Sequence, residues 1–126
     1  GKIFGNAEAE AEIERLTKAL KAYHKKVERL EKRINSLESE RAKLESKINK
    51  IKKQRGFLKR FLTFVTRHDP ELKDKFVKLE KINEKIKEKN NKINEKEEEF
   101  EKVYDEVKEE YPKWVEDWEN KLKKSS

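Results

Sequence analysis

Between residues 13 and 65 the apolar residues recur at alternating intervals of three and four. An average spacing of 3.5 residues, kept over about seven heptads, is typical of a helix that packs lengthwise on another helix as a coiled coil. The seam also passes through two polar residues, Arg41 and Arg55. Its apolar members are Ile13, Leu16, Leu20, Tyr23, Val27, Leu30, Ile34, Leu37, Leu44, Ile48, Ile51, Leu58, Leu62 and Val65.

A second seam with the same spacing follows in the C-terminal half of the chain. Between the two seams, Asp69 suits an N-cap, Pro70 the first helical position and Glu71 the positive end of the helix dipole. We therefore predict helix one at about 7–66, a turn at 67–70 and helix two at about 70–123. The members of the second seam are Ile86, Asn90, Ile93, Glu97, Phe100, Tyr104, Val107, Tyr111, Trp114 and Trp118.

Pro112 interrupts the second helical stretch because it lacks a backbone donor. Trp114 and Trp118 stay in phase with the seam. The sequence therefore predicts a kink near Pro112 rather than a reversal of the chain.

The two seams predict an all-α fold, a long antiparallel two-helix coiled-coil hairpin that self-associates into a helical bundle. With a turn at 67–70, the numbers of facing residues add up to 137 or 138, which places Arg41 opposite Glu97. A parallel homodimer would instead stack Arg41 on its own copy, and like charges within a seam are costly. We therefore expect an Arg41–Glu97 structural pair inside one chain.

Charged residues make up 48% of the 126 residues, which favours one elongated unit, residues 1–126, over a globule with a thick core. The richness in Lys and Glu resembles thermophile usage. Cysteine is absent, and no run of 18 apolar residues and no signal peptide is present. We expect a soluble, intracellular protein.

An aromatic stripe beside the first seam, Phe57, Phe61 and Phe64, predicts a contact at the tip of the hairpin. Phe76 and Val77 add apolar surface near the same end. Apolar surface that one partner helix cannot cover indicates a protein partner or a second copy of the chain. The alternative is a locally thicker core in which the loop folds over the phenylalanines.

A basic stretch with no acidic residue precedes the turn, and it predicts a second kind of contact. Rows of cations bind nucleic-acid phosphates without sequence preference, or lie on an anionic membrane surface. The alternative is a solvated face, paired in part with glutamates across the hairpin. The candidate residues are Lys47, Lys50, Lys52, Lys53, Arg55, Lys59 and Arg60.

Aromatic residues gather again near the C-terminus, where Trp114 and Trp118 are expected to hold the open end of the hairpin closed. His24 and His68 have no companions at metal-ligand spacing, and no phosphate-binding loop or nucleophile with a base is present. We expect no metal, no cofactor, no small-molecule substrate and no enzymatic activity. The predicted function is a structural or adaptor module that binds a macromolecule or itself through the phenylalanine-rich tip.

Overall fold

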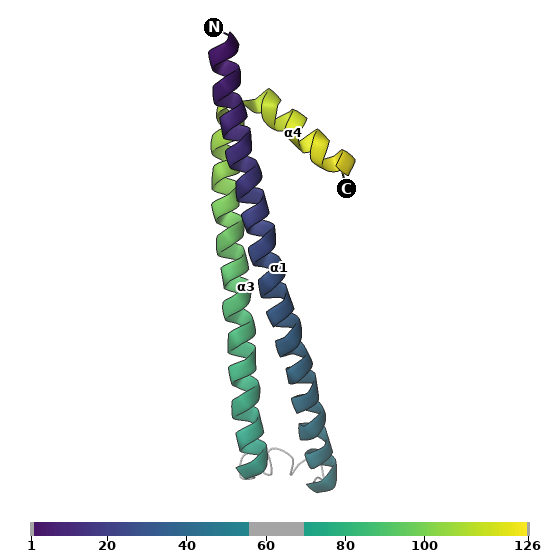
Figure 1. Cartoon of the computed structure of the whole chain (residues 1–126). Coiled ribbons are helices and arrows are strands. Elements are labelled where there is room, and N and C mark those ends of the chain that lie inside the picture. The colour runs from purple at the N-terminus through teal and green to yellow at the C-terminus, as the bar shows by residue number, and fades with distance from the viewer. Residues whose placement is uncertain (1, 56–69, 126) are drawn as a thin grey trace. The chain divides into compact units, whose positions relative to one another are not determined.

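The computed structural model describes residues 2–55 and 70–125, with residues 2–6 and 55 described by their backbone alone. These residues form three helices, α1 (Lys2–Arg55), α3 (Pro70–Glu110) and α4 (Pro112–Ser125) (Figure 1). The helices α1 and α3 pack together as a hairpin, and α4 is a short C-terminal helix. The predicted all-α class and the helical hairpin are confirmed.

Helix α3 begins at Pro70 and carries Glu71 in its first turn, as the sequence predicts. A proline at the first helical position loses no hydrogen bond, and an acidic side chain there opposes the helix dipole. The predicted continuation of helix one to residue 66 and the turn at 67–70 fall on residues 56–69, outside the described part of the chain.

The structure differs from the prediction at Pro112, where the second helix is interrupted rather than kinked. The Tyr111 N–H donates to the Val107 carbonyl at 2.8 Å, and the Val115 N–H donates to the Tyr111 carbonyl at 3.1 Å. Tyr111 therefore ends one hydrogen-bonded series and opens the next. A residue before proline is disfavoured in the helical region, and Pro112 is well suited to start a new helix.

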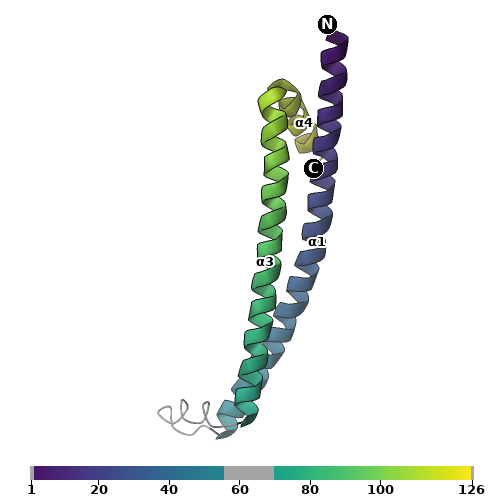
Figure 2. The ribbon, with the colours of Figure 1, turned by 90° about the vertical axis from the view of Figure 1, so that its left-hand side faces the viewer.

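The chain divides into two compact units, unit 1 (residues 1–29 and 92–126) and unit 2 (residues 30–91). In unit 1, α4 leaves the end of α3 beside α1 (Figure 2), and its C-terminal end points away from both long helices (Figure 1). The most deeply buried residues, Leu16, Val107 and Val115, come one from each helix. The side chains packed against these three are Ile13, Phe100, Val103, Tyr104 and Trp118.

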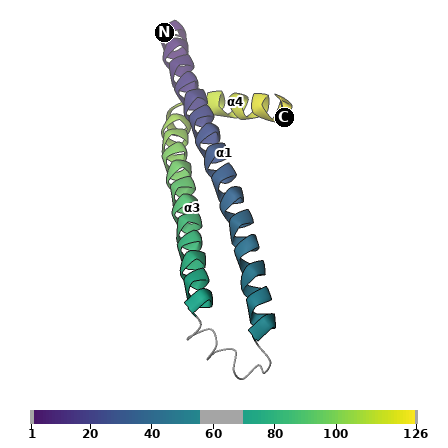
Figure 3. The same cartoon turned by 60° about the horizontal axis from the view of Figure 1, so that its bottom comes forward.

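Unit 2 contains only α1 and α3 among its described residues. The described ends of these helices, at Arg55 and Pro70, lie at the same end of the unit (Figure 3). The apolar core near this end consists of Ile48, Ile51 and Leu72, with Leu44, Phe76 and Leu79 packed against them.

The register of the hairpin differs from the predicted one. The numbers of facing residues add up to 123 for Tyr23 and Phe100, whose rings stack with centroids 5.7 Å apart. They add up to 124 for Arg41 and Asn83, which share a hydrogen bond of 3.0 Å. The predicted values were 137 or 138, so α3 is displaced by about fourteen residues, which is two heptads. A displacement of whole heptads leaves the same face of each helix in the seam, so the pattern alone does not distinguish the two registers.

Candidate functional site

Of the predicted tip residues, the structure describes Phe76 and Val77, while Phe57, Phe61 and Phe64 lie outside the described residues. Phe76 is half-buried and packs against the core of unit 2. Val77, the next residue, is 44% exposed. Phe76 therefore contributes to the fold, and Val77 is the part of the predicted surface that faces solvent.

The predicted basic stretch overlaps this region. The Lys52 ammonium lies 5.3 Å from the centroid of the Phe76 ring, within reach of a cation–π interaction. Lys52 is half-buried, whereas Lys47, Lys50 and Lys53 are exposed. The Arg55 side chain, Lys59 and Arg60 lie outside the described residues, so the structure places four of the seven predicted cations.

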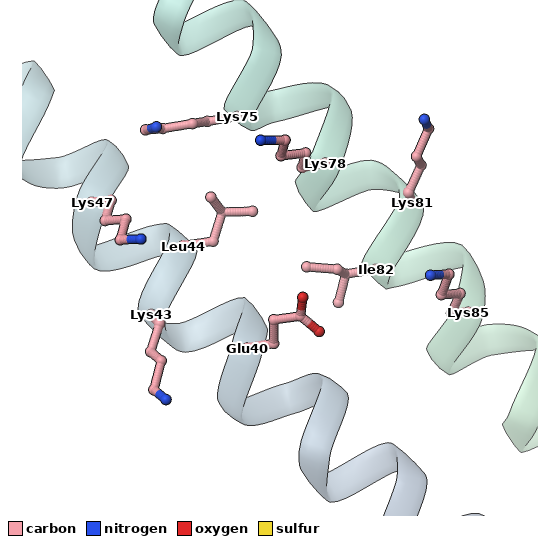
Figure 4. A pocket seen from close by; sticks show the side chains of 9 residues that line it. All are labelled: Glu40, Lys43, Leu44, Lys47, Lys75, Lys78, Lys81, Ile82 and Lys85. Carbon is pink, nitrogen blue, oxygen red and sulfur yellow. The ribbon is translucent and has the colours of Figure 1, made fainter.

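A groove with a volume of about 370 Å³ runs between α1 and α3 in unit 2, and sequence reasoning did not find it. Leu44 and Ile82 face each other across it (Figure 4). Glu40 is the one acidic residue in its lining. The other lining residues are Lys43, Lys47, Lys75, Lys78, Lys81 and Lys85.

The lysines of this groove come from both helices. Figure 4 shows the Lys47 side chain directed toward α3, and the Lys75 and Lys78 side chains directed toward α1. Lys78 also lies 3.2 Å from the Asp74 carboxylate, one turn away on the same helix. Both members of this pair are 62% exposed, and an exposed pair of this kind contributes only about 0.3–0.5 kcal/mol. An anion can therefore compete for Lys78 at little cost.

A second groove, with a volume of about 450 Å³, shares Lys85 with the first. Both grooves therefore belong to one face of the hairpin within unit 2. The lining of the second groove is Arg33, Ser36, Leu37, Lys85, Glu88 and Lys89.

The lysines of α3 were missed because the C-terminal half of the chain has an acidic balance as a whole. Four lysines of α3 recur at intervals of three or four, and this spacing was the signal for a lysine-lined helical face. They are Lys75, Lys78, Lys81 and Lys85. The displaced register then brings them beside Lys43 and Lys47, residues that the predicted register pairs with positions near 90–95.

Arg41 donates from its guanidinium to the Asn83 side-chain oxygen, and its side chain is half-buried. The predicted partner, Glu97, is exposed and belongs to unit 1, whereas Arg41 belongs to unit 2. The side-chain partner that the structure shows for Arg41 is therefore Asn83 and not the predicted Glu97. An ion pair in a seam is close to energetically neutral, so it did not decide the register.

In unit 1, hydrogen bonds attach α4 to both long helices. The Trp118 indole N–H donates to the Thr17 hydroxyl at 3.0 Å, and the Tyr104 hydroxyl donates to the Glu119 carboxylate. The bond to Glu119, together with burial, raises the pKa of Tyr104. Aromatic residues do gather at this end of the chain, and α4 brings Trp118 to Thr17 rather than to the predicted Leu20.

A smaller groove of about 150 Å³ lies in unit 1 beside the stacked rings of Tyr23 and Phe100. A salt bridge joins the Arg15 guanidinium to the Glu106 carboxylate at 2.8 Å, and Arg15 also pairs with Glu12. Hydrogen bonds to Glu106 first, and to Glu12, raise the pKa of Arg15. The Arg15 guanidinium is thus paired with two carboxylates.

Among residues 2–55 and 70–125, no group of three or more His, Cys, Asp or Glu side chains is arranged to hold a metal ion. The His24 ring lies against Tyr23, with centroids 5.6 Å apart, and His68 lies outside the described residues. No helix in the described part of the chain is long and apolar enough to cross a membrane.

Comparison of the chain with protein-family models, curated proteins and solved structures finds no match.

Proposed function

We propose that the chain is a non-enzymatic interaction module that binds a macromolecular partner, or a second copy of itself, through apolar residues at the turn end of unit 2. The register of the hairpin supports this proposal. Leu72, the third residue of α3, clusters with Ile48 and Ile51. The first residues of α3 thus face a part of α1 that precedes residues 57–65.

In the predicted register, residues 57–65 faced the first turns of α3, with Leu58 opposite Leu79. Leu79 instead packs against the cluster of Ile48, Ile51 and Leu72. In the observed register the first turns of α3 pack against Leu44, Ile48 and Ile51 of α1. The apolar residues of the sequence 57–65 are Phe57, Leu58, Phe61, Leu62, Phe64 and Val65.

Six large apolar side chains within nine residues of the sequence are typical of a contact region. Val77 adds to this surface, since it is 44% exposed on the first turns of α3. Burial of such side chains contributes about 1.5–3 kcal/mol each, which makes the turn end a strong contact region. Formation of a bundle from two hairpins and docking on another protein both use this surface.

The test is the solution mass of a variant with Phe57, Phe61 and Phe64 replaced by Gln, measured by sedimentation across a range of protein concentrations. We expect the wild type to form an oligomer and the variant to remain a monomer with unchanged helix content. Leu122→Gln is the control, because Leu122 is 38% exposed on α4, in unit 1. A wild-type oligomer that survives the triple substitution, or that Leu122→Gln dissociates, contradicts self-association through this end.

The sequence also predicts nucleic-acid binding through residues 47–60, and membrane-surface binding as a third function. The specific observation that favours the nucleic-acid function is the lysine-lined groove. It includes Lys47 of the predicted stretch and extends to α3.

A further inference from the structure

We propose that a lysine strip on one face of unit 2 binds the phosphodiester backbone of a nucleic-acid duplex, without sequence preference. This inference rests on the nucleic-acid function named above and gives its site, which requires neither the phenylalanine-rich tip nor residues 50–60. The lysine strip consists of Arg33, Lys43, Lys47, Lys75, Lys78, Lys81, Lys85 and Lys89.

The strip is continuous, because the two grooves that it borders share Lys85. On α3 its members recur at intervals of three or four, which keeps them on one helical face, and on α1 Lys43 and Lys47 are four residues apart. From Lys75 to Lys89 the strip covers fourteen residues of α3, or about 21 Å at 1.5 Å per residue. It thus extends over about six base pairs of a duplex, at 3.4 Å per pair.

The charge of the strip is far from balanced. Its eight cations face only two carboxylates within the linings, those of Glu40 and Glu88. The imbalance also holds for the whole sequence of unit 2, which has 19 Lys and Arg against 10 Asp and Glu, a net charge of +9. Clustered like charges destabilise a fold and attract a polyanion to the surface.

Phosphate suits these side chains as a ligand group. Seven of the eight cations are lysines, which bind phosphate as flexible point charges. A membrane surface fits less well, because an interfacial helix needs an outward apolar face. The apolar residues of the grooves, Leu37, Leu44 and Ile82, are half-buried or buried in the hairpin.

The grooves favour a duplex over a single strand. Proteins that bind single strands without sequence preference stack the bases on aromatic side chains. Neither groove has an aromatic residue in its lining. A duplex, which keeps its bases stacked and carries one negative charge per about 1.7 Å, needs only the cations.

The test compares two triple variants of the full chain that have the same net charge. The groove variant is Lys75→Gln, Lys78→Gln and Lys85→Gln, and the control variant is Lys21→Gln, Lys25→Gln and Lys102→Gln, at exposed positions of unit 1. Binding is measured by fluorescence anisotropy with a labelled duplex of about 20 base pairs, at several salt concentrations between about 50 and 200 mM. A second duplex of unrelated sequence and one single strand are measured in parallel.

For the wild type we expect equal affinity for the two duplexes and a steep fall in affinity with salt. In the groove variant the slope of log K against log salt should decrease by about 2.7, because each phosphate contact contributes about 0.9. The control variant should keep most of the wild-type slope. An unchanged slope in the groove variant, or equal losses in both variants, overturns the proposal. Tighter binding of the single strand, or binding to phosphatidylserine vesicles without binding to the duplex, overturns it as well.

Thermal unfolding of the free protein separates a binding role of the strip from a structural one. Lysines that only stabilised the hairpin would lower the melting temperature when replaced. Lysines that serve binding rather than folding repel one another in the free protein and lower its stability. The groove variant should therefore melt at the wild-type temperature or above it, while its affinity for the duplex falls. A lower melting temperature together with unchanged affinity contradicts the assignment.

Discussion

The two units of the molecule use the same α1–α3 hairpin in different ways. Unit 1 has a nearly balanced charge, with 15 Lys and Arg against 17 Asp and Glu, and it adds α4 and stacked aromatic rings to the hairpin. Unit 2 has a net charge of +9, and Phe76 is the one aromatic residue in its described part. Unit 1 therefore combines packing with directional hydrogen bonds, whereas unit 2 carries the excess of positive charge.

The comparison of the two units shows which side chains the fold buries. In unit 1 the core residues come from three helices, so that Leu16, Val107 and Val115 are almost completely buried. In unit 2 the seam of two helices leaves Leu44 half-buried beside the lysine-lined groove. Two helices suffice to form the hairpin. The accumulation of lysines on one of its faces is the basis of the proposed duplex-binding site.

The largest expected effect is the loss of a leucine side chain, and its size should depend on how far that leucine is buried. Leu16→Ala removes a fully buried side chain, for which we expect a loss of about 3 kcal/mol in the free energy of unfolding. Leu44→Ala truncates the same side chain where it is half-buried, so we expect about 1 kcal/mol. Urea unfolding followed by circular dichroism measures both. Equal losses of unfolding free energy in the two variants would contradict the difference in burial between Leu16 and Leu44.

Loss of a hydrogen bond that attaches α4 should have an intermediate effect on stability, and this effect should depend on pH. Tyr104→Phe removes the hydrogen bond to Glu119, at a cost of about 1 kcal/mol. Because the pKa of Tyr104 is raised in the folded state, first by Glu119 and then by burial, its contribution is complete below pH 10. The contribution decreases as the pH rises through 10 and beyond, since the unfolded chain loses the proton first.

Alkaline titration of stability checks this prediction. Wild-type stability should decrease above about pH 10, and Tyr104→Phe should flatten that decrease. The matched control is Tyr23→Phe, which keeps the ring stacked on Phe100. A pH dependence that Tyr104→Phe leaves unchanged contradicts the role given to this hydroxyl.

The smallest effect belongs to the polar pair in the seam of unit 2. Arg41 bonds to the neutral amide of Asn83 and is half-buried, so Arg41→Ala should cost only about 0.5–1.5 kcal/mol. A double-mutant cycle of Arg41→Ala with Asn83→Ala should show coupling, whereas a cycle with Glu97→Ala should be additive. Coupling to Glu97 would favour the predicted register over the observed one.

The sequence predicted the features that depend on local periodicity. The spacing of Leu16, Ile34 and Ile48 identified the buried face of α1, and these residues are in fact buried. Pro70 correctly located the start of α3. Both inferences need only the helical period and the backbone chemistry of proline.

The features that depend on long-range packing were not predicted. A displacement by two heptads keeps every seam residue in the seam, so only the fit of particular side chains, such as Tyr23 on Phe100, selects the register. The return of α4 was missed because Trp118 is in phase with the seam, although its indole N–H bonds to Thr17. The lysine-lined groove was missed because it follows from the register.

The most direct test of the account is a crosslink that reads the register in unit 2. The chain contains no cysteine, so any disulfide that forms within a chain joins the two introduced cysteines. Ile51→Cys with Leu72→Cys joins two residues of one buried cluster, whereas Ile51→Cys with Ile86→Cys joins the pair that the predicted register places face to face.

Leu72 and Ile86 are fourteen residues apart on α3, or about 21 Å, so one disulfide geometry excludes the other. The account predicts rapid oxidation of the Ile51–Leu72 pair and none of the Ile51–Ile86 pair, read as a mobility shift under non-reducing conditions. The reverse result would restore the predicted register. That result would separate the lysines of α3 from those of α1, and it would place residues 57–65 opposite α3.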